Sequence, residues 1–592
     1  MEKKICDSDI LNPRIDTGVD RGKTVDVKIN GHTVRGYEGE TIAAVLALSG
    51  LRTLRHTHRH HDPRGLYCCM GTCHNCLVTV NGRPNVRACV TLIEQSQEIV
   101  LQDGFGRLDA DAPIPNPGKL FRQKVQILVI GGGPAGLSAA ISAAQSGAEV
   151  LIIDENLQLG GQIYRQLPKT FQIKDPDVFG ADFLDGRALL KHAANIDDRI
   201  TTWTDTSVWG VFEDRQIAVM RNNQMILIDA QAIIVATGTY ERPFPVPGWT
   251  LPGVMTVGGA QLLIKSQQIR PGQRVLLAGT GPLQLVVANQ MLEAGMEVVA
   301  IADTASIRIP TRYLVKLFSR FDLLKQGLKY LFRLRKAGVK MLFSHALKAV
   351  EGNDKVKRAA LCKVDSRSNP VDRTSHMFDV DTVCIGYGLI PNTWITRLLD
   401  CRHVYRQMVG GWVPVFNKNM ELSQTGIFAA GDGAGVAGVM SARSQGSIAG
   451  LNAAAHCGVI TKEQALKSSQ PYCKELSSLH KFRFAIDRMY AIQPALYANI
   501  TDDTIVCRCE EITAGEIRHA IRNGTTNPND IKKRTRAGMG YCQGMNCLPT
   551  IVMILVMEFH VKPEDIKIMN PRPPVRPIPL NLLMADFVED FK

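Results

Sequence analysis

The sequence predicts a multi-domain α/β protein. The first reason is a strand–glycine–helix–strand pattern at Val125–Asp154, VQILVIGGGPAGLSAAISAAQSGAEVLIID, and the second is a weaker repeat of it at 275–303. The third is the distribution of the 15 cysteines, of which five lie within Cys68–Cys89 and four within Cys507–Cys547. At 592 residues the chain is too long for one hydrophobic core, so several domains are expected.

The composition is that of an ordinary globular protein, with 45% hydrophobic and 21% charged residues. The net charge of +13 is spread along the chain, and no nucleic-acid-binding module is recognisable, so bound anionic groups explain the charge better than nucleic acid. The first residues lack the apolar core of a signal peptide, and the apolar run Ile551–Met557 is too short to span a bilayer. We expect a cytoplasmic protein, and peripheral attachment to the inner membrane stays open.

The segment 24–103 is predicted to be a small β-rich domain, preceded by a tail over 1–23. Two Asn-Gly pairs, Asn30-Gly31 and Asn81-Gly82, each stand between strand-like runs and therefore predict hairpins. Between the hairpins, Thr41–Ser49 predicts a short helix.

Four cysteines of this domain follow the spacing C-x4-C-x2-C…C, which is that of plant-type [2Fe–2S] ferredoxins. The candidate ligands are Cys68, Cys73, Cys76 and Cys89. Gly71 is small enough for the loop to close on a cluster, and Cys69 is off the spacing and predicted not to be a ligand. Zinc, which also accepts four thiolates, is the rival metal. The nearby stretch RHTHRHHDPRG, with Asp62 as a possible ligand, matches no metal spacing, so a solvated basic loop is favoured over a second metal site.

A glycine- and proline-rich linker is predicted at 104–122, and a dinucleotide-binding unit follows. Gly131 permits the tight turn, Gly133 lets the backbone approach a pyrophosphate, and Gly136 lets the helix pack closely on the strand. The helix N-terminus, with Pro134 and Ala135 in its first turn, offers free N–H groups to phosphates.

The residues after the second strand are predicted to complete this site. Asp154 is placed to bind a pair of ribose hydroxyls, and Glu155 follows it. Gly161, followed by Gln162, would allow a close approach of the backbone to the pyrophosphate. Disulfide reductases of this fold carry a cysteine pair hereabouts. This sequence has no cysteine between Cys89 and Cys362, which excludes disulfide reduction.

Two later segments are predicted to return to the same site. The buried strand Ile233–Val235 leads into the small-residue turn Thr237-Gly238. A further strand, in SQTGIFAAGDGAG, ends at Gly431-Asp432, where an aspartate suits the ribityl chain or the phosphates of a flavin.

A second nucleotide-binding unit is predicted at 249–375, between the two parts of the first unit at 123–248 and 376–460. Gly279 and Gly281 repeat the first two glycines, but Gln284 stands where the third is expected and would hold the helix and strand further apart. Asp303 comes one residue after the expected acid. The pattern predicts the fold and leaves open NAD(P), another nucleotide or an empty structural domain.

The last cysteine site is predicted in the segment 468–560, followed by a tail over 561–592. Cys507 and Cys509 precede a helix that starts with the capping box Thr513-x-x-Glu516. Cys542 and Cys547 precede an apolar helix at 550–559. Helix N-termini stabilise thiolates and anionic clusters, and by ligand count alone zinc and [2Fe–2S] are both open.

These motifs carry a resemblance that covers nearly the whole chain. CRCEEITAGEI with GMGYCQGMNC resembles the BFD-like [2Fe–2S] domain, named after bacterioferritin-associated ferredoxin. GGGPAG, ATGTYERP, GTGPLQ and GIFAAGD resemble the two-domain flavoproteins of the pyridine-nucleotide-disulfide-reductase superfamily, without the disulfide. This domain order is similar to the A or α subunits of bacterial amine-oxidising complexes of the opine oxidase, hydrogen cyanide synthase, and hydroxyproline or proline dehydrogenase type. The chain lacks the large folate-binding extension of sarcosine oxidase α, which argues against that enzyme.

The resemblance implies a β-grasp ferredoxin-like domain, a two-domain FAD/NAD(P)-binding core of Rossmann type and a small helical BFD-like domain. It implies FAD and two [2Fe–2S] clusters as cofactors, and it leaves open an FMN at a subunit interface. It also implies a hetero-oligomer in which a D-amino-acid-oxidase-like flavoprotein subunit oxidises the amine. No Ser/His/Asp set and no carboxylate pair with catalytic spacing is visible in this sequence, so no catalytic residue is predicted.

We therefore predict an electron-transfer subunit of an opine-, hydroxyproline- or glycine-type amine or amino-acid dehydrogenase or oxidase. A flavin accepts two electrons together and releases them singly, and each [2Fe–2S] cluster takes one. Two alternatives stay open. One is a self-sufficient NAD(P)H-dependent reductase that uses the second nucleotide-binding unit, and the other is a non-enzymatic assembly or sensor protein.

Overall fold

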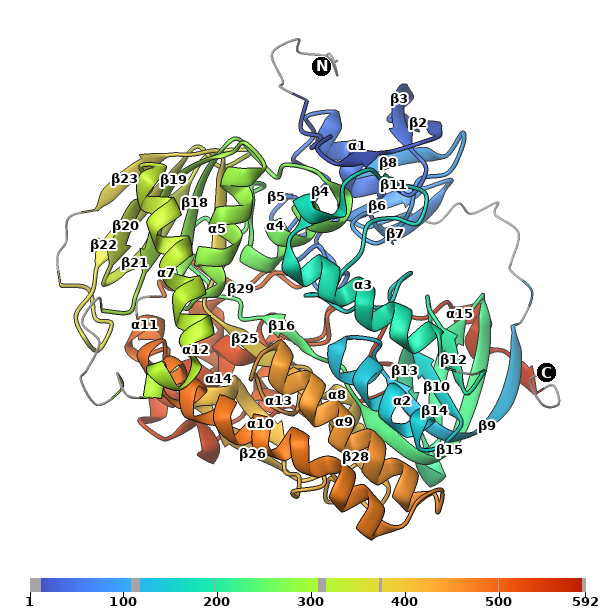
Figure 1. Cartoon of the computed structure of the whole chain (residues 1–592). Helices are drawn as coiled ribbons and strands as arrows, with labels where there is room; N and C mark the ends of the chain where they lie inside the picture. Colours follow the sequence, from blue (N-terminus) through green and yellow to red (C-terminus); the bar gives the residue numbers. More distant parts are fainter. Residues whose placement is uncertain are drawn as a thin grey trace.

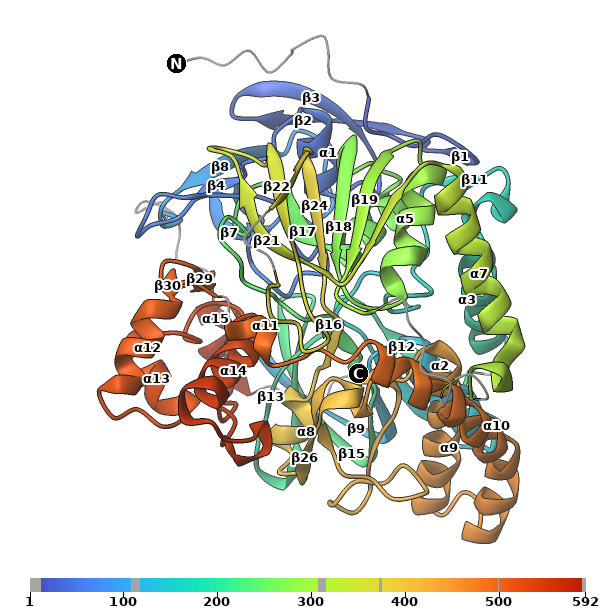
Figure 2. The ribbon, with the colours of Figure 1, turned by 90° about the vertical axis from the view of Figure 1, so that its left-hand side faces the viewer.

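The computed structural model describes residues 12–587, apart from 108–115, 117, 197, 307–312, 314–315, 372–374 and 499. Residues 108–115 and 117 of the predicted linker therefore lie outside the described residues. Figures 1 and 2 show the ferredoxin-like domain above two nucleotide-binding units, with the helices of the C-terminal domain beside the second unit. In the part of the chain that the structure describes, no helix is long and apolar enough to cross a membrane.

The ferredoxin-like domain packs one helix against a mixed sheet. Both predicted hairpins are confirmed, because Asn30-Gly31 and Asn81-Gly82 have positive φ at both turn residues, as a two-residue type I′ turn requires. The predicted helix is α1 (Ile42–Leu48), capped by the Thr41 hydroxyl, which accepts a hydrogen bond from Ala44 N. The strands are β2 (Thr24–Ile29), β3 (His32–Tyr37), β4 (Arg55–His56), β5 (Pro63–Arg64), β6 (Leu77–Val80), β7 (Arg83–Arg87) and β8 (Glu98–Asp103).

The first nucleotide unit is built on an eight-stranded sheet whose central strands are parallel. The helix α2 (Pro134–Gln145) follows the glycine turn, and α9 (Val439–His456) packs against it. A Cβ atom at Gly446 or Gly450 would collide with the α2 backbone, so glycine sets how closely the two helices approach. The strands are β9 (Lys119–Ile130), β10 (Val150–Ile153), β12 (Ile200–Trp203), β13 (Ser207–Val211), β14 (Ile217–Arg221), β15 (Gln224–Val235), β28 (Ile427–Ala429) and β31 (Asp586–Phe587).

The second nucleotide unit has a five-stranded parallel sheet, with α4 (Val257–Leu262), α5 (Leu283–Glu293) and α7 (Phe321–Lys336) beside it. Its strands, in spatial order, are β17 (Val254–Thr256), β24 (Thr382–Gly386), β18 (Arg274–Gly279), β19 (Glu297–Asp303) and β20 (Lys340–Phe343). The strand β24 lies beyond the boundary predicted at residue 375 and belongs to this second sheet. The sequence could not show to which sheet β24 belongs, because a parallel strand that is buried on both faces has the same apolar pattern in either sheet. An antiparallel sheet follows β20, made of β21 (His345–Glu351), β22 (Arg358–Lys363) and β23 (His376–Asp379).

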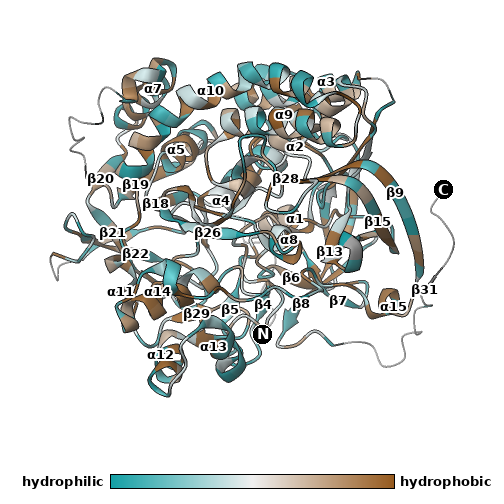
Figure 3. Ribbon diagram, turned by 90° about the horizontal axis from the view of Figure 1, so that it is seen from below, coloured by the Kyte–Doolittle hydropathy of each residue, from teal (hydrophilic) through white to brown (hydrophobic). Residues whose placement is uncertain are grey.

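The C-terminal domain is helical and centred on α14 (Leu548–Phe559), LPTIVMILVMEF, which is apolar on all sides and mostly buried (Figure 3). Around it lie α11 (Ala495–Ala498), α12 (Ala514–Arg522) and α13 (Pro528–Thr535). The short hairpin of β29 (Ile505–Cys507) and β30 (Ile512–Thr513) lies between α11 and α12 in the chain. The long helix α10 (Lys462–Met489) spans residue 468, where the boundary of the last domain was predicted. It packs along α9 and so belongs to the first nucleotide unit.

The described parts of both segments predicted as tails, residues 12–23 and 561–587, pack on the rest of the protein. Residues 19–20 form β1 (Val19–Asp20) against β11 (Gln172–Ile173), and the buried carboxylate of Glu40 pairs with Arg14 and Arg21. At the other end, Leu582 is fully buried and β31 extends the first sheet beside β9. Neither segment shows a regular hydrophobic period, because each is held by contacts with distant parts of the chain.

Candidate redox centres

The first cysteine set lies in the loop between β5 and β6 and just after β7. Its members Cys68, Cys73, Cys76 and Cys89 are all buried. The thiol of Cys68 contacts that of Cys73, and the thiol of Cys76 contacts that of Cys89. The loop closes at Gly71, which has a φ of +79° and whose carbonyl accepts a hydrogen bond of 2.8 Å from Arg87 Nη1. The structure thus brings the four predicted ligands together in two contacting pairs.

Cys69 lies apart from this set. It is buried in the apolar core of the second nucleotide unit, among residues such as Met255 and Cys384. This placement agrees with its predicted role outside the cluster.

The second cysteine set joins the β29–β30 hairpin to the start of α14. Cys547 is the N-cap residue of α14, Cys507 ends β29, and the Sγ atoms of Cys509 and Cys542 are 3.6 Å apart. The capping box of Thr513 and Glu516 at the start of α12 is confirmed. Hydrogen bonding with Cys547, helped by backbone N–H groups of the surrounding loops, lowers the pKa of Cys507 to about 7. These donors favour a thiolate, the form in which cysteine binds iron.

A cavity of about 380 Å³ lies at the carboxyl ends of the first sheet's strands, and is here called the flavin cavity. Predicted residues that line it are Gly131, Gly133, Pro134, Ala135, Asp154, Glu155, Gly161, Gln162, Thr237, Gly238, Gly431 and Asp432. Gly136 stands behind this lining, where a Cβ atom would collide with the carbonyl of Gly131. A Cβ atom at Gly161 would come within 2.9 Å of Gly133 Cα, so two glycine backbones form one edge of the cradle. The cradle fits a dinucleotide because backbone N–H groups can reach its phosphates.

The two acids after β10 have different partners. Asp154 accepts hydrogen bonds from Gly132 N at 2.7 Å and from Asn156 N at 2.8 Å, so its carboxylate holds the glycine turn in place. Glu155 Oε2 accepts a hydrogen bond of 3.0 Å from Arg576. Both acids line the cavity, and ribose binding by Asp154 stays a prediction. On the opposite side, Asp432 Oδ1 accepts hydrogen bonds from the backbone N–H groups that precede α9.

Other lining residues carry no pattern in the sequence that could have identified them. Cys68, Met70 and Thr72 of the first cysteine loop line the flavin cavity, and so do Met545 of the second loop and Arg576. The flavin site and both cysteine sites are therefore neighbours in space, although the cysteine loops are far apart in the chain.

Glu241 is another lining residue that the sequence did not reveal. Its Oε2 accepts a hydrogen bond of 2.8 Å from Gly258 N at the start of α4, and its Oε1 has no hydrogen-bond partner among the described residues. Burial raises the pKa of this carboxyl group to about 7. Glu241 can therefore exchange a proton with a bound group near neutral pH.

Gly279 and Gly281 of the second nucleotide unit are not among the residues that line the flavin cavity. A Cβ atom at Gly279 would collide with Gly386 O of the neighbouring strand, whereas the space around Gly281 is open. Gln284 is 1% exposed, and neither polar atom of its amide has a hydrogen-bond partner among the described residues. Nucleotide binding at Gly279 and Gly281 stays a prediction.

In the histidine-rich loop, the acid that lies beside the histidines is Asp103 and not Asp62, which the sequence suggested. His61 Nδ1 lies 3.3 Å from Asp103 Oδ1 and its ring stacks on His56, whereas Asp62 pairs with Arg64. The side chains of His61 and Asp103 are 67% and 75% exposed, which agrees with the predicted solvated loop.

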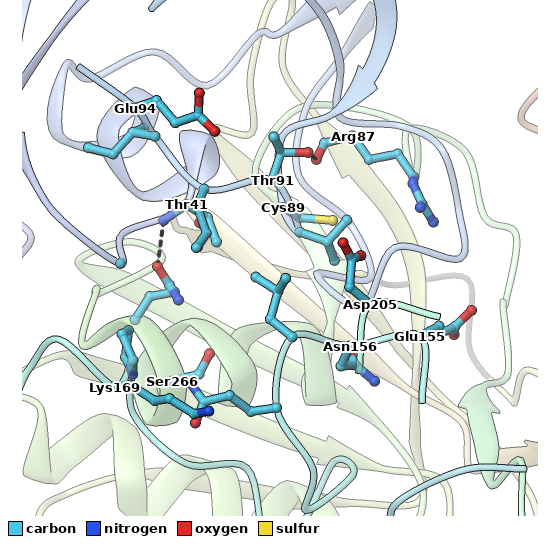
Figure 4. A pocket seen from close by; sticks show the side chains of 18 of the residues that line it. Thr41, Arg87, Cys89, Thr91, Glu94, Glu155, Asn156, Lys169, Asp205 and Ser266 are labelled. Atoms are coloured by element: carbon cyan, nitrogen blue, oxygen red, sulfur yellow. Dashed lines mark hydrogen bonds between the residues drawn. The ribbon is translucent and has the colours of Figure 1, made fainter. Parts of the chain in front are cut away.

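A second cavity, of about 850 Å³, separates the ferredoxin-like domain from the nucleotide units. Figure 4 shows Cys89 and Arg87 of the first cysteine site on its wall, together with Asp205 and Asn156 of the first nucleotide unit. One edge is closed by a hydrogen bond of 2.8 Å from Thr41 N to Gln267 Oε1. The first cysteine set thus lies between two cavities, with Cys68 at one and Cys89 at the other.

Three family models match successive parts of the chain. The 2Fe-2S iron-sulfur cluster binding domain matches residues 22–104, and the BFD-like [2Fe-2S] binding domain matches residues 505–557. The pyridine nucleotide-disulphide oxidoreductase model matches residues 125–448, more than half of the chain. The chain belongs to the pyridine nucleotide-disulphide oxidoreductase family. Within this oxidoreductase family, the two flanking matches decide for iron–sulfur clusters over zinc at both cysteine sets.

Known relatives match about three quarters of the chain, and a solved structure matches nearly all of it. The A subunit of opine oxidase from Rhizobium meliloti is 32% identical over 477 residues, which are 78% of this chain and 87% of the relative. The HcnB subunit of hydrogen cyanide synthase from Pseudomonas protegens is 30% identical, over 77% of this chain and 96% of the relative. The crystal structure of L-proline dehydrogenase from P. horikoshii superposes with a TM-score of 0.71 at 20% identity, over 97% of this chain and 100% of that chain. That likeness shows a common fold.

This pyridine nucleotide-disulphide oxidoreductase is therefore a flavin oxidoreductase with FAD and two [2Fe–2S] clusters as its cofactors. Its residues fit these groups, since a glycine cradle borders the flavin cavity and each cysteine set offers four converging thiols. The resemblance stated from the motifs is confirmed.

Proposed function

We propose that this chain is the electron-transfer subunit of a heteromeric amine or amino-acid dehydrogenase or oxidase, of the opine, hydroxyproline or glycine type. A D-amino-acid-oxidase-like flavoprotein subunit oxidises the substrate, and this chain passes the electrons to an acceptor. The similarity to subunits of opine oxidase and hydrogen cyanide synthase supports a heteromeric enzyme. A cytoplasmic location stays a prediction.

The observation that carries the proposal is the lining of the flavin cavity. Cys68 of the first cysteine loop and Met545 of the second both line it, so a flavin bound there would have an iron–sulfur site on either side. FAD supplies the ability to accept two electrons together and release them one at a time. The chain's own residues bind and orient this cofactor. Gly131, Gly133, Gly136 and Asp432 hold the dinucleotide, and Glu241 exchanges the proton that accompanies reduction of the flavin.

The cysteine assignments complete the proposal. Cys68, Cys73, Cys76 and Cys89 hold the first cluster. Cys507, Cys509, Cys542 and Cys547 hold the second. Seven of the eight cysteines are buried and Cys509 is partly exposed, so water has little access to the iron sites, which helps to set their reduction potentials.

The proposal is tested on the native complex, isolated through a tag on this chain and supplied anaerobically with proline, hydroxyproline, glycine and opines in turn. We expect a second flavoprotein subunit in the complex, reduction of flavin by one of these substrates, and transfer of electrons to ferricyanide. A Cys509→Ser variant should still show substrate-dependent flavin reduction, but lose most of the transfer to ferricyanide. A control variant, Cys473→Ser, changes an exposed cysteine outside both sets and should behave as the wild type.

Two results would contradict the proposal. One is a complex without a second flavoprotein subunit that still oxidises an amine. The other is rapid bleaching of the flavin of the isolated chain by NADH, which would instead identify a self-sufficient NAD(P)H-dependent reductase that uses the second nucleotide unit.

A further inference from the structure

A buried arginine lies between the two cysteine sets. Arg508 is 2% exposed, and its guanidinium group contacts the rings of both Tyr67 and Trp249, at 4.1 and 4.6 Å from the ring centroids. The two rings meet edge to face, with an interplanar angle of 82°. Tyr67 directly precedes the first cluster ligand, Cys68, and Trp249 is itself fixed by a hydrogen bond of 2.7 Å from its Nε1 to Ile505 O. The arginine therefore has one well-defined position, determined by both domains.

One hydrogen bond joins the two ligand loops. Arg508 stands between the ligands Cys507 and Cys509, and its Nε donates to Asn75 Oδ1 at 3.3 Å. Asn75 is the residue before the ligand Cys76, and its side chain also interacts with the thiol of Cys73. The route from the first set to the second thus consists of covalent bonds and this single hydrogen bond.

The buried guanidinium group of Arg508 is stabilised by a negatively charged group near it. Its hydrogen bonds go to neutral acceptors, Asn75 Oδ1 and Trp249 O. A buried cation is costly unless an anionic group lies near it. The thiol groups of Cys73 and Cys509 interact electrostatically with the guanidinium, one from each set. A cluster held by four thiolates is anionic, and it becomes more so by one charge when it is reduced.

We propose that Arg508 and Asn75 form the electron-transfer contact between the two iron–sulfur clusters, and that the Arg508 cation raises the reduction potential of both. This deepens the electron-transfer role proposed above, but it rests on the two cluster sites and not on the partner subunit. In each transfer one cluster is oxidised by one electron and the other is reduced by the same electron. No bond forms or breaks and no proton needs to move. Arg508 and Asn75 act as positioning residues, because neither binds iron.

The test uses the full chain loaded with iron and sulfide, reduced anaerobically with dithionite and followed by electron paramagnetic resonance. The Cys509→Ser variant assigns the two signals, since it removes the second cluster. In the wild type, we expect the fully reduced protein to show the broadening and fast relaxation of two interacting spins. After half an equivalent of reductant, samples frozen at successive times measure how fast the electron distributes between the two clusters.

Three variants separate the effect of the Arg508 charge from the effect of the hydrogen bond between Arg508 and Asn75. Arg508→Gln should leave about tenfold fewer clusters reduced, relative to oxidised, at a fixed ambient potential, which corresponds to about 59 mV for one electron. Asn75→Leu keeps the cation and all eight cysteines but removes the amide beside the Cys73 thiol. It should therefore change the ratios less than Arg508→Gln does, while it slows equilibration between the clusters about tenfold or more. Arg59→Gln is the matched control, because Arg59 joins the same two domains through Glu516 at the surface. It should match the wild type in both measurements.

Wild-type potentials together with wild-type equilibration in Arg508→Gln would overturn the proposal. If Arg508→Gln fails to assemble its clusters, Asn75→Leu alone tests the proposed contact between the clusters. An unchanged rate of equilibration in Asn75→Leu would then refute the proposal. Because dithionite replaces both the substrate and the partner, the result does not depend on whether this chain belongs to an amine-oxidising complex.

Discussion

The first and second nucleotide units use the same strand–turn–helix plan, but their turns are offset by one residue. In the first unit Asp154 accepts hydrogen bonds from Gly132 N and from the backbone N–H two residues further on. In the second unit Asp303 does the same with Gly281 N and Ala305 N, at 3.3 and 2.8 Å. The acid therefore secures the glycine turn in both units, but in the second it reaches the turn one position later.

The offset changes the backbone that a ligand would meet. Gly133, the N-cap residue of α2, has an extended conformation with φ of −78°, and the helix follows immediately. Its counterpart Gly281 has φ of +106°, and α5 starts after Pro282. The third position differs too: at Gly136 there is no room for a side chain, whereas Gln284 is accommodated with its amide buried. A glycine pattern thus identifies the fold of both units, while the helix–strand distance at the third position separates a tight cradle from a looser one.

The largest expected effect comes from Gly136→Ala, because its methyl group would collide with the carbonyl of Gly131 and push α2 away from the cradle. We expect a loss of about 3 kcal/mol in the free energy of unfolding and the loss of most bound flavin. Absorbance at 450 nm per chain and a urea titration measure both. Gln284→Leu, at the matching position of the second unit, should retain its flavin. Equal flavin loss in the two variants would show that the third position does not distinguish the units.

The next largest expected effect concerns Asp303, the acid that secures the glycine turn of the second nucleotide unit. Burial raises the pKa of Asp303 to about 6 from an ordinary value of 3.8. The folded protein therefore keeps this proton longer than the unfolded chain. The resulting stabilisation is complete below about pH 4 and disappears as the pH rises through about 6, a loss of about 3 kcal/mol at 1.36 kcal/mol per pKa unit.

Asp303→Asn removes this ionisation, so the free energy of unfolding should vary less between pH 4 and 6.5 than in the wild type. Urea titrations across that range measure the slope. The comparison is with Asp154→Asn in the first unit, where burial raises the aspartate pKa in the same direction. An unchanged slope in Asp303→Asn would mean that this carboxylate is already ionised in the folded protein at low pH.

A smaller effect is expected from Gln284→Leu itself. Replacing a buried amide, which has no partner among the described residues, by an apolar group of similar size should raise the free energy of unfolding by about 1 kcal/mol. Thermal unfolding measures this change. NADH binding by the wild type that is lost in the variant would instead make the amide a nucleotide contact and the second unit a functional site.

The smallest effect concerns the C-terminal segment, which reaches the flavin cavity of the first unit through Arg576. Arg576→Gln breaks a partly exposed ion pair with Glu155, so the dissociation constant of FAD should rise about two- to fivefold. Arg572→Gln, an exposed arginine of the same segment, is the control and should leave FAD binding unchanged. A flavin titration of the apoprotein compares them. Equal affinities in the two variants would remove Arg576 from the site.

The sequence predicted most of what depends on short segments. The Asn-Gly hairpins, the glycine turn at Gly131, the capping box at Thr513 and both cysteine sets all follow from residues a few positions apart. Such patterns are reliable because turn conformation, cap hydrogen bonds and ligand spacing are local properties of the chain. The domain boundaries were less certain, and β24 and α10 each pack with a unit other than the expected one.

By itself, the sequence determined where a dinucleotide cradle and two sets of four cysteines lie along the chain, since such sites require particular residues at particular spacings. Only the tertiary structure decided how these sites relate. Asn75 and Arg508 are 433 residues apart, and the segment around Arg576 has no periodic pattern, yet both lie at the redox sites. Contacts of this kind depend on how whole domains pack, and a buried arginine or an extended proline-rich segment carries no local signal of the partner that it will meet.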